Sequence, residues 1–184
     1  MAVTFERLQD LVKAEGIRFY LHPTAARLGF QVRGVSGLYD LRIALEQDGT
    51  VLQIHSRRLL ECSPDHPHLG QLLHTLATID HELVLFKLGW EPVKGEVIAY
   101  TDALVGDAEL TQQQVRSLMG TYLVGLERSV PRLQHVLRTG LDPGPVAFED
   151  AVAAVLKGIM GASTANTPGA QRTSEAEKPL LTEL

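Results

Sequence analysis

The side chains best suited to chemistry in this sequence lie together in one short stretch. Cys62, Asp65, His66 and His68 are all residue types that bind divalent metal ions in proteins. Their spacing matches no established zinc motif. A structural interpretation competes, because Asp65 precedes a predicted helix, where an Asp would cap free amide groups. We expect a loop that leads into a helix, and we keep a metal-dependent enzyme centred on these four residues as the alternative.

Nucleophilic catalysis would depend on Cys62, the one cysteine of the chain. A reactive thiol needs a lowered pKa, and the neighbouring carboxylates of Glu61 and Asp65 would raise it. The sequence contains neither a G-x-S-x-G elbow nor a glycine-rich phosphate-binding motif. We therefore predict no catalytic residues, no bound metal and no cofactor.

Composition excludes several classes of protein. The chain has 184 residues, of which 45% are hydrophobic and 21% charged, as is typical of a soluble globular domain. A formal net charge of -5 argues against a nucleic-acid binder, which needs a basic face. No apolar run reaches the roughly 18 residues of a membrane span, and residues 1–7 lack the order of a signal peptide. We expect a cytoplasmic protein that binds neither nucleic acid nor membranes.

The first half of the chain changes from a helical to an alternating pattern. Apolar residues recur at helical spacing between Thr4, a predicted N-cap, and Gly16. Asp48-Gly49 predicts a hairpin turn, because both positions tolerate positive φ. Alternation of apolar and polar residues predicts antiparallel strands over 17–21, 28–32, 39–46 and 50–55.

The second half returns to helices. The predicted elements are a helix over 69–79, strands over 83–90 and 96–104, and a last helix over 148–159. Thr111 and Gln114 form a predicted capping box at the start of a long helix. Pro131 predicts a kink or a restart of that helix, since proline cannot donate to the helical ladder.

Three segments follow from these changes of pattern. We expect an α+β domain over residues 1–140, then a linker and appended amphipathic helix over 141–161. Residues 162–184 are rich in Ser, Thr, Ala and Gly and lack periodicity, which predicts a flexible tail.

Five other residues carry specific expectations. The basic doublet Arg57-Arg58, at the predicted end of a strand, would protect an edge or face a partner. Trp90 is expected in the core with its indole N–H paired, although a half-exposed Trp90 would anchor an interface. Gly120 and Gly125 weaken the long helix, which indicates that another element packs closely there.

The order of these elements resembles a known family. The apolar spacing and turns of residues 72–80, 83–88, 94–97 and 110–115 are similar to those of the YbjN family, over residues 4–137. The chain departs from the family at Asp80, where an Asn is common. The resemblance implies the α+β fold of type III secretion chaperones, a twisted antiparallel sheet flanked by helices. It also implies a small acidic protein, usually dimeric, that holds an extended client segment.

We therefore predict a non-enzymatic adaptor or chaperone-like protein, a homodimer, that holds a short segment of a client protein. An open antiparallel sheet has edge N–H and C=O groups that pair with a partner's strand, and an acidic chain favours basic or neutral clients. In a third hypothesis, residues 179–184 are themselves the segment bound by another protein. Alternation and aromatic content give the predicted partner-binding residues, Tyr39, Leu41, Ile43, Ile54, Phe86, Trp90 and Tyr122.

Overall fold

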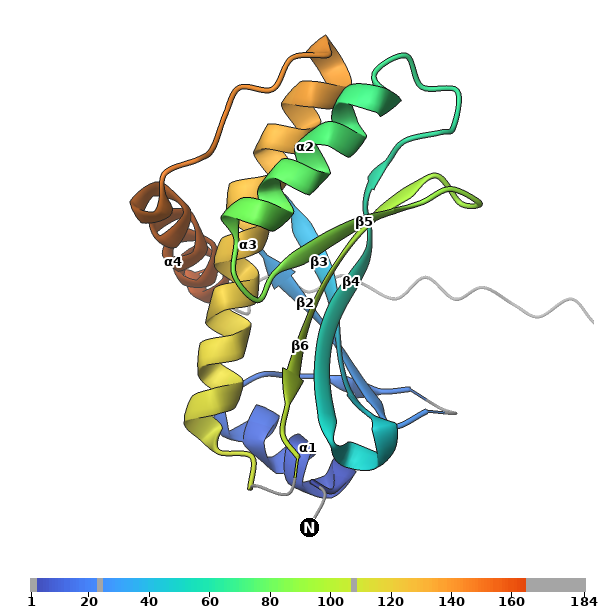
Figure 1. The fold of residues 1–184 in the computed structure, drawn as a ribbon. Helices are drawn as coiled ribbons and strands as arrows, with labels where there is room; N and C mark the ends of the chain where they lie inside the picture. Colours follow the sequence, from blue (N-terminus) through green and yellow to red (C-terminus); the bar gives the residue numbers. More distant parts are fainter. Residues whose placement is uncertain (1–2, 23–24, 107–108, 165–184) are drawn as a thin grey trace, which may run out of the picture.

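One open antiparallel sheet organises the molecule. The computed structural model describes residues 3–22, 25–106 and 109–164, and its strands follow the order β1-β2-β3-β4-β6-β5 (Figure 1). Every pair of neighbouring strands is antiparallel. The strands are β1 (Tyr20–Leu21), β2 (Arg27–Arg33), β3 (Leu38–Glu46), β4 (Val51–Glu61), β5 (Lys87–Glu91) and β6 (Glu96–Leu104).

Within residues 3–22, 25–106 and 109–164, four α-helices accompany the sheet, which confirms the predicted α+β class. They are α1 (Phe5–Ala14), α2 (Leu69–Glu82), α3 (Gln112–Thr139) and α4 (Phe148–Thr164). The long helix α3 contacts β4, β6 and the other three helices. Figure 1 shows α3 running along the sheet, with α2 beside its upper part and α1 near its lower end. This helix is therefore the element that joins the others.

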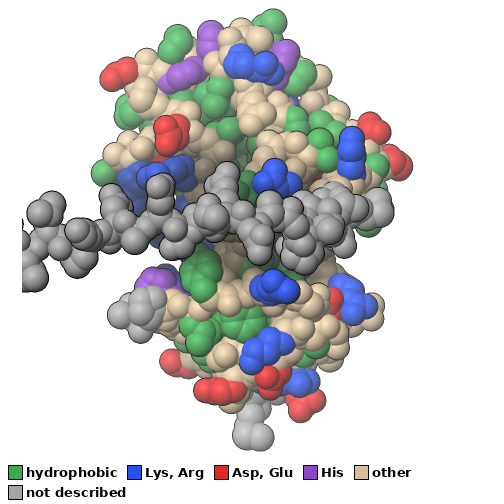
Figure 2. All heavy atoms as spheres, turned by 180° about the vertical axis from the view of Figure 1, so that it is seen from behind, with side chains coloured by type: hydrophobic (Ala, Val, Ile, Leu, Met, Phe, Trp, Pro, Cys, Tyr) green, Lys and Arg blue, Asp and Glu red, His purple; other side chains and the backbone are tan. Residues whose placement is uncertain are grey.

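Alternate residues of the central strands form the core beneath α3. Ile43, Ile54 and Val97 are buried on one face of the sheet, and Tyr122 and Leu126 of α3 are buried against them. The intervening residues point to the other face and are mostly polar. Figure 2 shows the molecule from behind, with Lys and Arg side chains spread over this face. The sheet thus has an apolar inner face under α3 and a polar outer face.

Three local sequence signals are confirmed by hydrogen bonds and dihedral angles. The Thr4 side chain accepts the Arg7 N–H at 3.2 Å, and α1 begins at the next residue, Phe5. Thr111 and Gln114 form the predicted capping box at the start of α3. The turn containing Asp48-Gly49 joins β3 to β4, with φ of 56° and 84° at these two residues.

Three strand predictions were wrong in their bounds. The strand predicted over 17–21 covers only Tyr20–Leu21. β4 continues to Glu61, with a register shift between Ser56 and Leu60 and a φ of 53° at Arg58. Arg57-Arg58 therefore lies inside an interior strand, not at the end of a strand or at the edge of the sheet. The strand predicted from residue 83 begins instead at Lys87, since α2 extends to Glu82 and Leu85 adopts a φ of 63°.

Polar groups near α2 also differ from expectation. His68 is the N-cap residue and no side chain caps the helix, so the predicted cap by Asp65 was wrong. At the other end, the Asp80 carboxylate accepts the Leu88 N–H at 2.8 Å. This bond attaches the start of β5 to α2.

The C-terminal helices fit the expected order with two corrections. The helix α3 continues through Pro131 to Thr139, so the predicted restart was wrong. It ends at Gly140, whose φ of 72° suits glycine. The helix α4 packs on α3 and β2 and extends through residues 162–164, beyond the end predicted for the appended helix. The remainder of the predicted tail, 165–184, lies outside the described residues.

The two glycines of α3 have different surroundings. A Cβ at Gly125 would lie 2.5 Å from the Phe86 ring, so the expected close packing is present there. A Cβ at Gly120 would meet nothing within 4 Å, so the same expectation was wrong at that position.

These surroundings predict opposite effects of alanine. Gly125→Ala should lower the free energy of unfolding by about 1–3 kcal/mol, because the added methyl group displaces the buried Phe86 ring. Gly120→Ala is the matched control and should raise stability by up to about 1 kcal/mol through helix propensity. Urea denaturation measures both variants, and equal effects would contradict the packing described for Phe86.

Candidate functional site

Six of the seven predicted partner-binding residues lie in the hydrophobic core. Their side chains are at most 5% exposed, so a partner could reach them only if the sheet and α3 separated. They are Tyr39, Leu41, Ile43, Ile54, Phe86 and Tyr122. The tyrosine hydroxyls are satisfied internally: that of Tyr122 lies 2.7 Å from Ser56 Oγ and donates to the Ala99 carbonyl at 3.0 Å. The surfaces available to a partner are therefore made of other residues.

Trp90, the seventh residue, is half-buried at the edge of the core. Its indole N–H donates to the Cys62 carbonyl at 2.9 Å, as expected for a paired core tryptophan. The bond ties β5 to the end of β4, so Trp90 has a structural role in this fold.

The loop containing Cys62, Asp65, His66 and His68 does not assemble a metal centre. Among the described residues, no three His, Cys, Asp or Glu side chains lie where they could hold a metal ion. His66 Nδ1 instead accepts the His68 N–H at 3.2 Å. The Cys62 side chain is 1% exposed and belongs to the core. The four side chains thus act as parts of a loop in this structure.

The buried thiol of Cys62 is unsuited to nucleophilic chemistry. Burial raises its pKa above the ordinary cysteine value, because the thiolate would lose its hydration. The direction agrees with the sequence prediction, but its cause is burial and not the neighbouring carboxylates.

Thiol labelling tests this description of Cys62. The native protein should react with a disulfide reagent far more slowly than the unfolded chain, since both access and ionisation are suppressed. The same protein in guanidinium chloride is the control. Rapid stoichiometric labelling of the native protein would contradict the burial of Cys62 and revive its catalytic interpretation.

An apolar cleft opens along α3 instead. Its upper part encloses about 270 Å³ between α3, the segment that follows α2, and the first residue of α4. Val84 is 80% exposed and Phe148 57% exposed at its rim. The residues that line this part are Glu82, Leu83, Val84, Phe86, Gly120, Thr121, Val124, Gly125, Arg128 and Phe148.

The lower part of the cleft lies between α3 and the end of β6. It encloses about 230 Å³ and meets the upper part at Thr121, with Leu85 between the two. The lining residues are Leu52, Leu85, Ala103, Leu104, Val105, Leu110, Gln114, Ser117, Leu118 and Thr121. We refer to both parts together as the α3 cleft.

A free strand edge borders the lower part. β5 pairs with β6 only over Glu96–Tyr100, whereas β4 pairs with β6 as far as Leu104. Within the described ranges, residues 101–104 of β6 therefore have a neighbouring strand on one side only. The Leu104 side chain is 88% exposed there. Unpaired backbone groups beside an apolar cleft are what an added strand needs.

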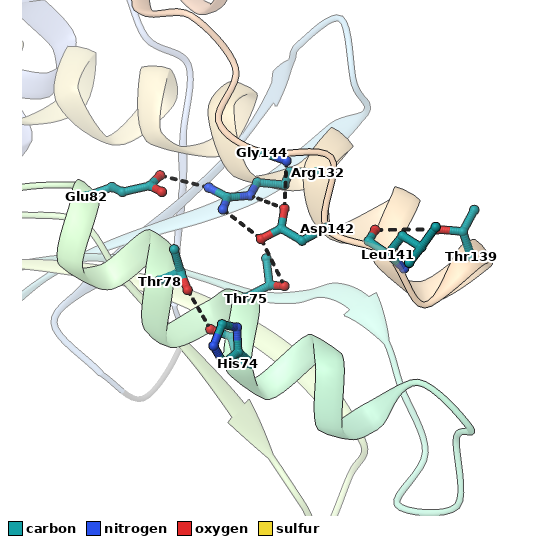
Figure 3. A network of polar contacts seen from close by, with 9 residues as sticks. All are labelled: His74, Thr75, Thr78, Glu82, Arg132, Thr139, Leu141, Asp142 and Gly144. Carbon is teal, nitrogen blue, oxygen red and sulfur yellow. Dashed lines mark hydrogen bonds and ion pairs between the residues drawn. The ribbon is translucent and has the colours of Figure 1, made fainter.

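The walls of the upper part are held by a buried arginine, Arg132 of α3 (Figure 3). Its Nε and Nη2 donate to the two Asp142 oxygens at 2.7 Å each, and its Nη1 donates to Glu82 at 2.8 Å. Asp142 also accepts the Gly144 N–H at 2.9 Å and the Thr75 hydroxyl at 3.4 Å. The guanidinium thus joins α2, α3 and the α3–α4 connection.

A second buried charge of α3 holds the β2–β3 turn. Glu127 is 3% exposed and accepts the Ser36 hydroxyl at 2.7 Å and the Tyr39 hydroxyl at 3.2 Å. Burial, followed by the Glu127 charge, raises the pKa of Tyr39.

Sequence reasoning missed Glu127 and Arg132. A signal existed, because both lie at helical spacing within the apolar stripe of α3, where an unpaired charge would be costly.

The Arg132 contacts predict that removing the guanidinium lowers the stability of the protein. The same change should also weaken the dependence of that stability on acidic pH. Arg132→Gln should lower the free energy of unfolding by about 3–5 kcal/mol, because two carboxylates lose their buried partner. Arg132 holds the pKa of Asp142 at about 2, below its usual 3.8. The folded state therefore binds fewer protons than the unfolded chain, and stability falls as the pH drops from 4 to 2.

Urea denaturation at pH 7 and at steps down to pH 2 measures both effects. Arg138→Gln, an exposed position of the same helix, is the control and should change stability by less than about 0.5 kcal/mol. An unchanged acid dependence in Arg132→Gln would contradict the role given to Asp142.

This fold also occurs in a protein of known structure. The α+β arrangement of an open antiparallel sheet against a long helix is the fold of YbjN from E. coli, a proposed transcription regulator. The TM-score is 0.56 at 13% identity, over 79% of this chain and 99% of that one. The structure of the HopA1–SchA chaperone–effector complex also matches, with a TM-score of 0.42 and 15% identity over 73% of this chain and 91% of that one.

No protein-family model matches the sequence, and no curated protein matches it either. The fold comparison thus confirms the predicted resemblance to the YbjN family in structure.

None of the helices in the described part of the chain is long and apolar enough to cross a membrane.

Proposed function

We propose that this protein is a non-enzymatic, chaperone-like adaptor that binds a short extended segment of a client protein in the α3 cleft. The observation that carries the proposal is the position of the free β6 edge, residues 101–104, beside the apolar lower part of that cleft. The proposal includes a cytoplasmic location and a homodimer, as the sequence and the fold resemblance imply.

The chemistry of the cleft indicates the kind of segment. A β-strand added to the β6 edge gains main-chain hydrogen bonds, and alternate side chains enter the adjoining pockets. Those pockets are lined mainly by apolar side chains such as Leu85, Leu118 and Val124. A segment with apolar residues at every second position therefore fits best. Glu82 is the one acidic residue of the rim, and Arg132 already pairs with it.

This site differs from the one predicted from the sequence. The partner-binding residues predicted from the sequence are largely core residues, whereas exposed or partly exposed residues around Thr121 line the α3 cleft. The shift is a consequence of packing, because α3 covers the apolar face of the central strands that alternation had identified.

A photo-crosslinking amino acid in the full chain tests the proposal. Placed at Thr121, in the middle of the α3 cleft, it should crosslink to a client segment in cells of the native host. Mass spectrometry should locate the crosslink in a short stretch of alternating apolar residues. The control is the same amino acid at Gln113, an exposed position of α3 outside the cleft, which should give no such product.

Matched substitutions extend the test. Thr121→Arg should reduce client recovery at least about tenfold by placing a charge in the cleft, while Gln113→Arg should leave it unchanged. Thermal unfolding of both variants shows whether they fold. Equal recovery with both variants, or crosslinks from Gln113 alone, would overturn the proposed site.

A further inference from the structure

The outer face of the sheet carries a group of side chains that the proposed function does not use. Strand register places Arg42 opposite His55, and His55 opposite Tyr100, in one row across β3, β4 and β6. Arg57 follows His55 by two residues and points to the same face. Figure 2 shows Lys and Arg side chains gathered at mid-height on the left, at the margin of a hollow.

Two hollows meet at Arg57. One encloses about 290 Å³, and His55 and Tyr100 line it together with Arg57. The other encloses about 300 Å³, and its lining residues are Asp40, Arg42, Arg57, Arg58, Lys94 and Glu96. We call the surface formed by Arg42, His55, Arg57 and Tyr100 the outer-face hollow.

Two ion pairs lie beside the outer-face hollow. Arg27 contacts Glu46 at 3.1 Å, and Arg58 contacts Glu96 at 3.3 Å. By contrast, no carboxylate of the described residues lies within ion-pair distance of Arg42 or Arg57. Two guanidinium groups thus lie on neighbouring strands without acidic partners, in a protein whose formal net charge is -5.

The lowered pKa of His55 agrees with a local excess of positive charge. Partial burial, and then the positive charges of Arg42, Arg57 and Arg27, lower its pKa to about 4. The imidazole is therefore neutral at pH 7, and the positive charge of the hollow comes from the arginines.

We infer that the outer-face hollow binds an acidic peptide segment of a partner protein, with carboxylates at alternate positions. The inference is independent of the proposed function, because it concerns the opposite face of the sheet. Arginine is suited to the task, since its planar guanidinium forms two parallel hydrogen bonds with a carboxylate.

The placement of the arginines is compatible with an extended segment. Arg42 and Arg57 lie on neighbouring strands and line the same hollow. In an extended peptide, residues i and i+2 point the same way and lie about 6.6–6.8 Å apart. A segment of the form Glu-x-Glu therefore presents two carboxylates on one side, one for each arginine of the outer-face hollow.

Nucleic acid is a poorer occupant for the same surface. The formal net charge of -5 repels a long polyanion, and Asp40 and Glu96 line the same hollow as Arg42 and Arg57. A short acidic segment contacts only the positive centre and avoids most of this repulsion.

Calorimetric titration of the full chain at low salt tests the inference. The probe is the capped heptapeptide Gly-Glu-Gly-Glu-Gly-Glu-Gly, and the control probe has Gln in place of Glu. We expect saturable binding of the Glu peptide alone. The double variant Arg42→Gln/Arg57→Gln should bind it at least about tenfold more weakly. The imidazole resonances of His55 should shift on binding to the native protein.

A matched double variant controls for net charge. Arg7→Gln/Arg18→Gln removes two exposed arginines elsewhere on the chain and should retain the affinity within about twofold. Thermal unfolding shows that both variants are folded. The inference is overturned if the Glu peptide does not bind saturably, if both double variants weaken binding equally, or if a short DNA duplex binds the hollow more tightly.

Discussion

The packing of α3 against one face of the sheet is the interaction on which the rest of this structure depends. Tyr122 and Leu126 are completely buried against the central strands, and the absence of a side chain at Gly125 admits the Phe86 ring. A single helix covers less area than a six-stranded, twisted sheet. The sheet is consequently enclosed along its middle and left accessible beside α3 and on its outer face, and both proposed binding surfaces lie in those accessible regions.

Buried charges of α3 determine how the surrounding elements are placed. Arg132 joins the end of α2 to the α3–α4 connection, and Glu127 holds the β2–β3 turn. Removing one partner of such a pair leaves an uncompensated charge, so the geometry tolerates little displacement. Apolar packing by itself would allow α2 and α4 to slide along α3. The ionic contact of Arg132 instead holds Glu82, which lines the α3 cleft, against α3.

The two accessible regions differ in chemistry. The α3 cleft is apolar and borders an unpaired strand edge, whereas the outer face carries arginines without acidic partners. An antiparallel sheet produces this contrast directly, because successive side chains of each strand point to opposite faces. One protein can therefore present an apolar surface and a cationic surface to different segments without any change of conformation, although its overall charge is negative.

The sequence by itself determined the elements whose signals are local. The Thr4 cap, the Thr111–Gln114 capping box, the Asp48-Gly49 turn and the α+β class all depend on neighbouring residues and were predictable. The tertiary structure decided which apolar residues remain accessible. Alternation places Ile43 and Ile54 on the apolar face of their strands. It does not show whether a partner or α3 covers that face, because either one would require apolar residues at the same positions. Likewise, the pairing of Arg132 with Asp142 and the isolation of Arg42 and Arg57 depend on distances between elements, which no local pattern encodes.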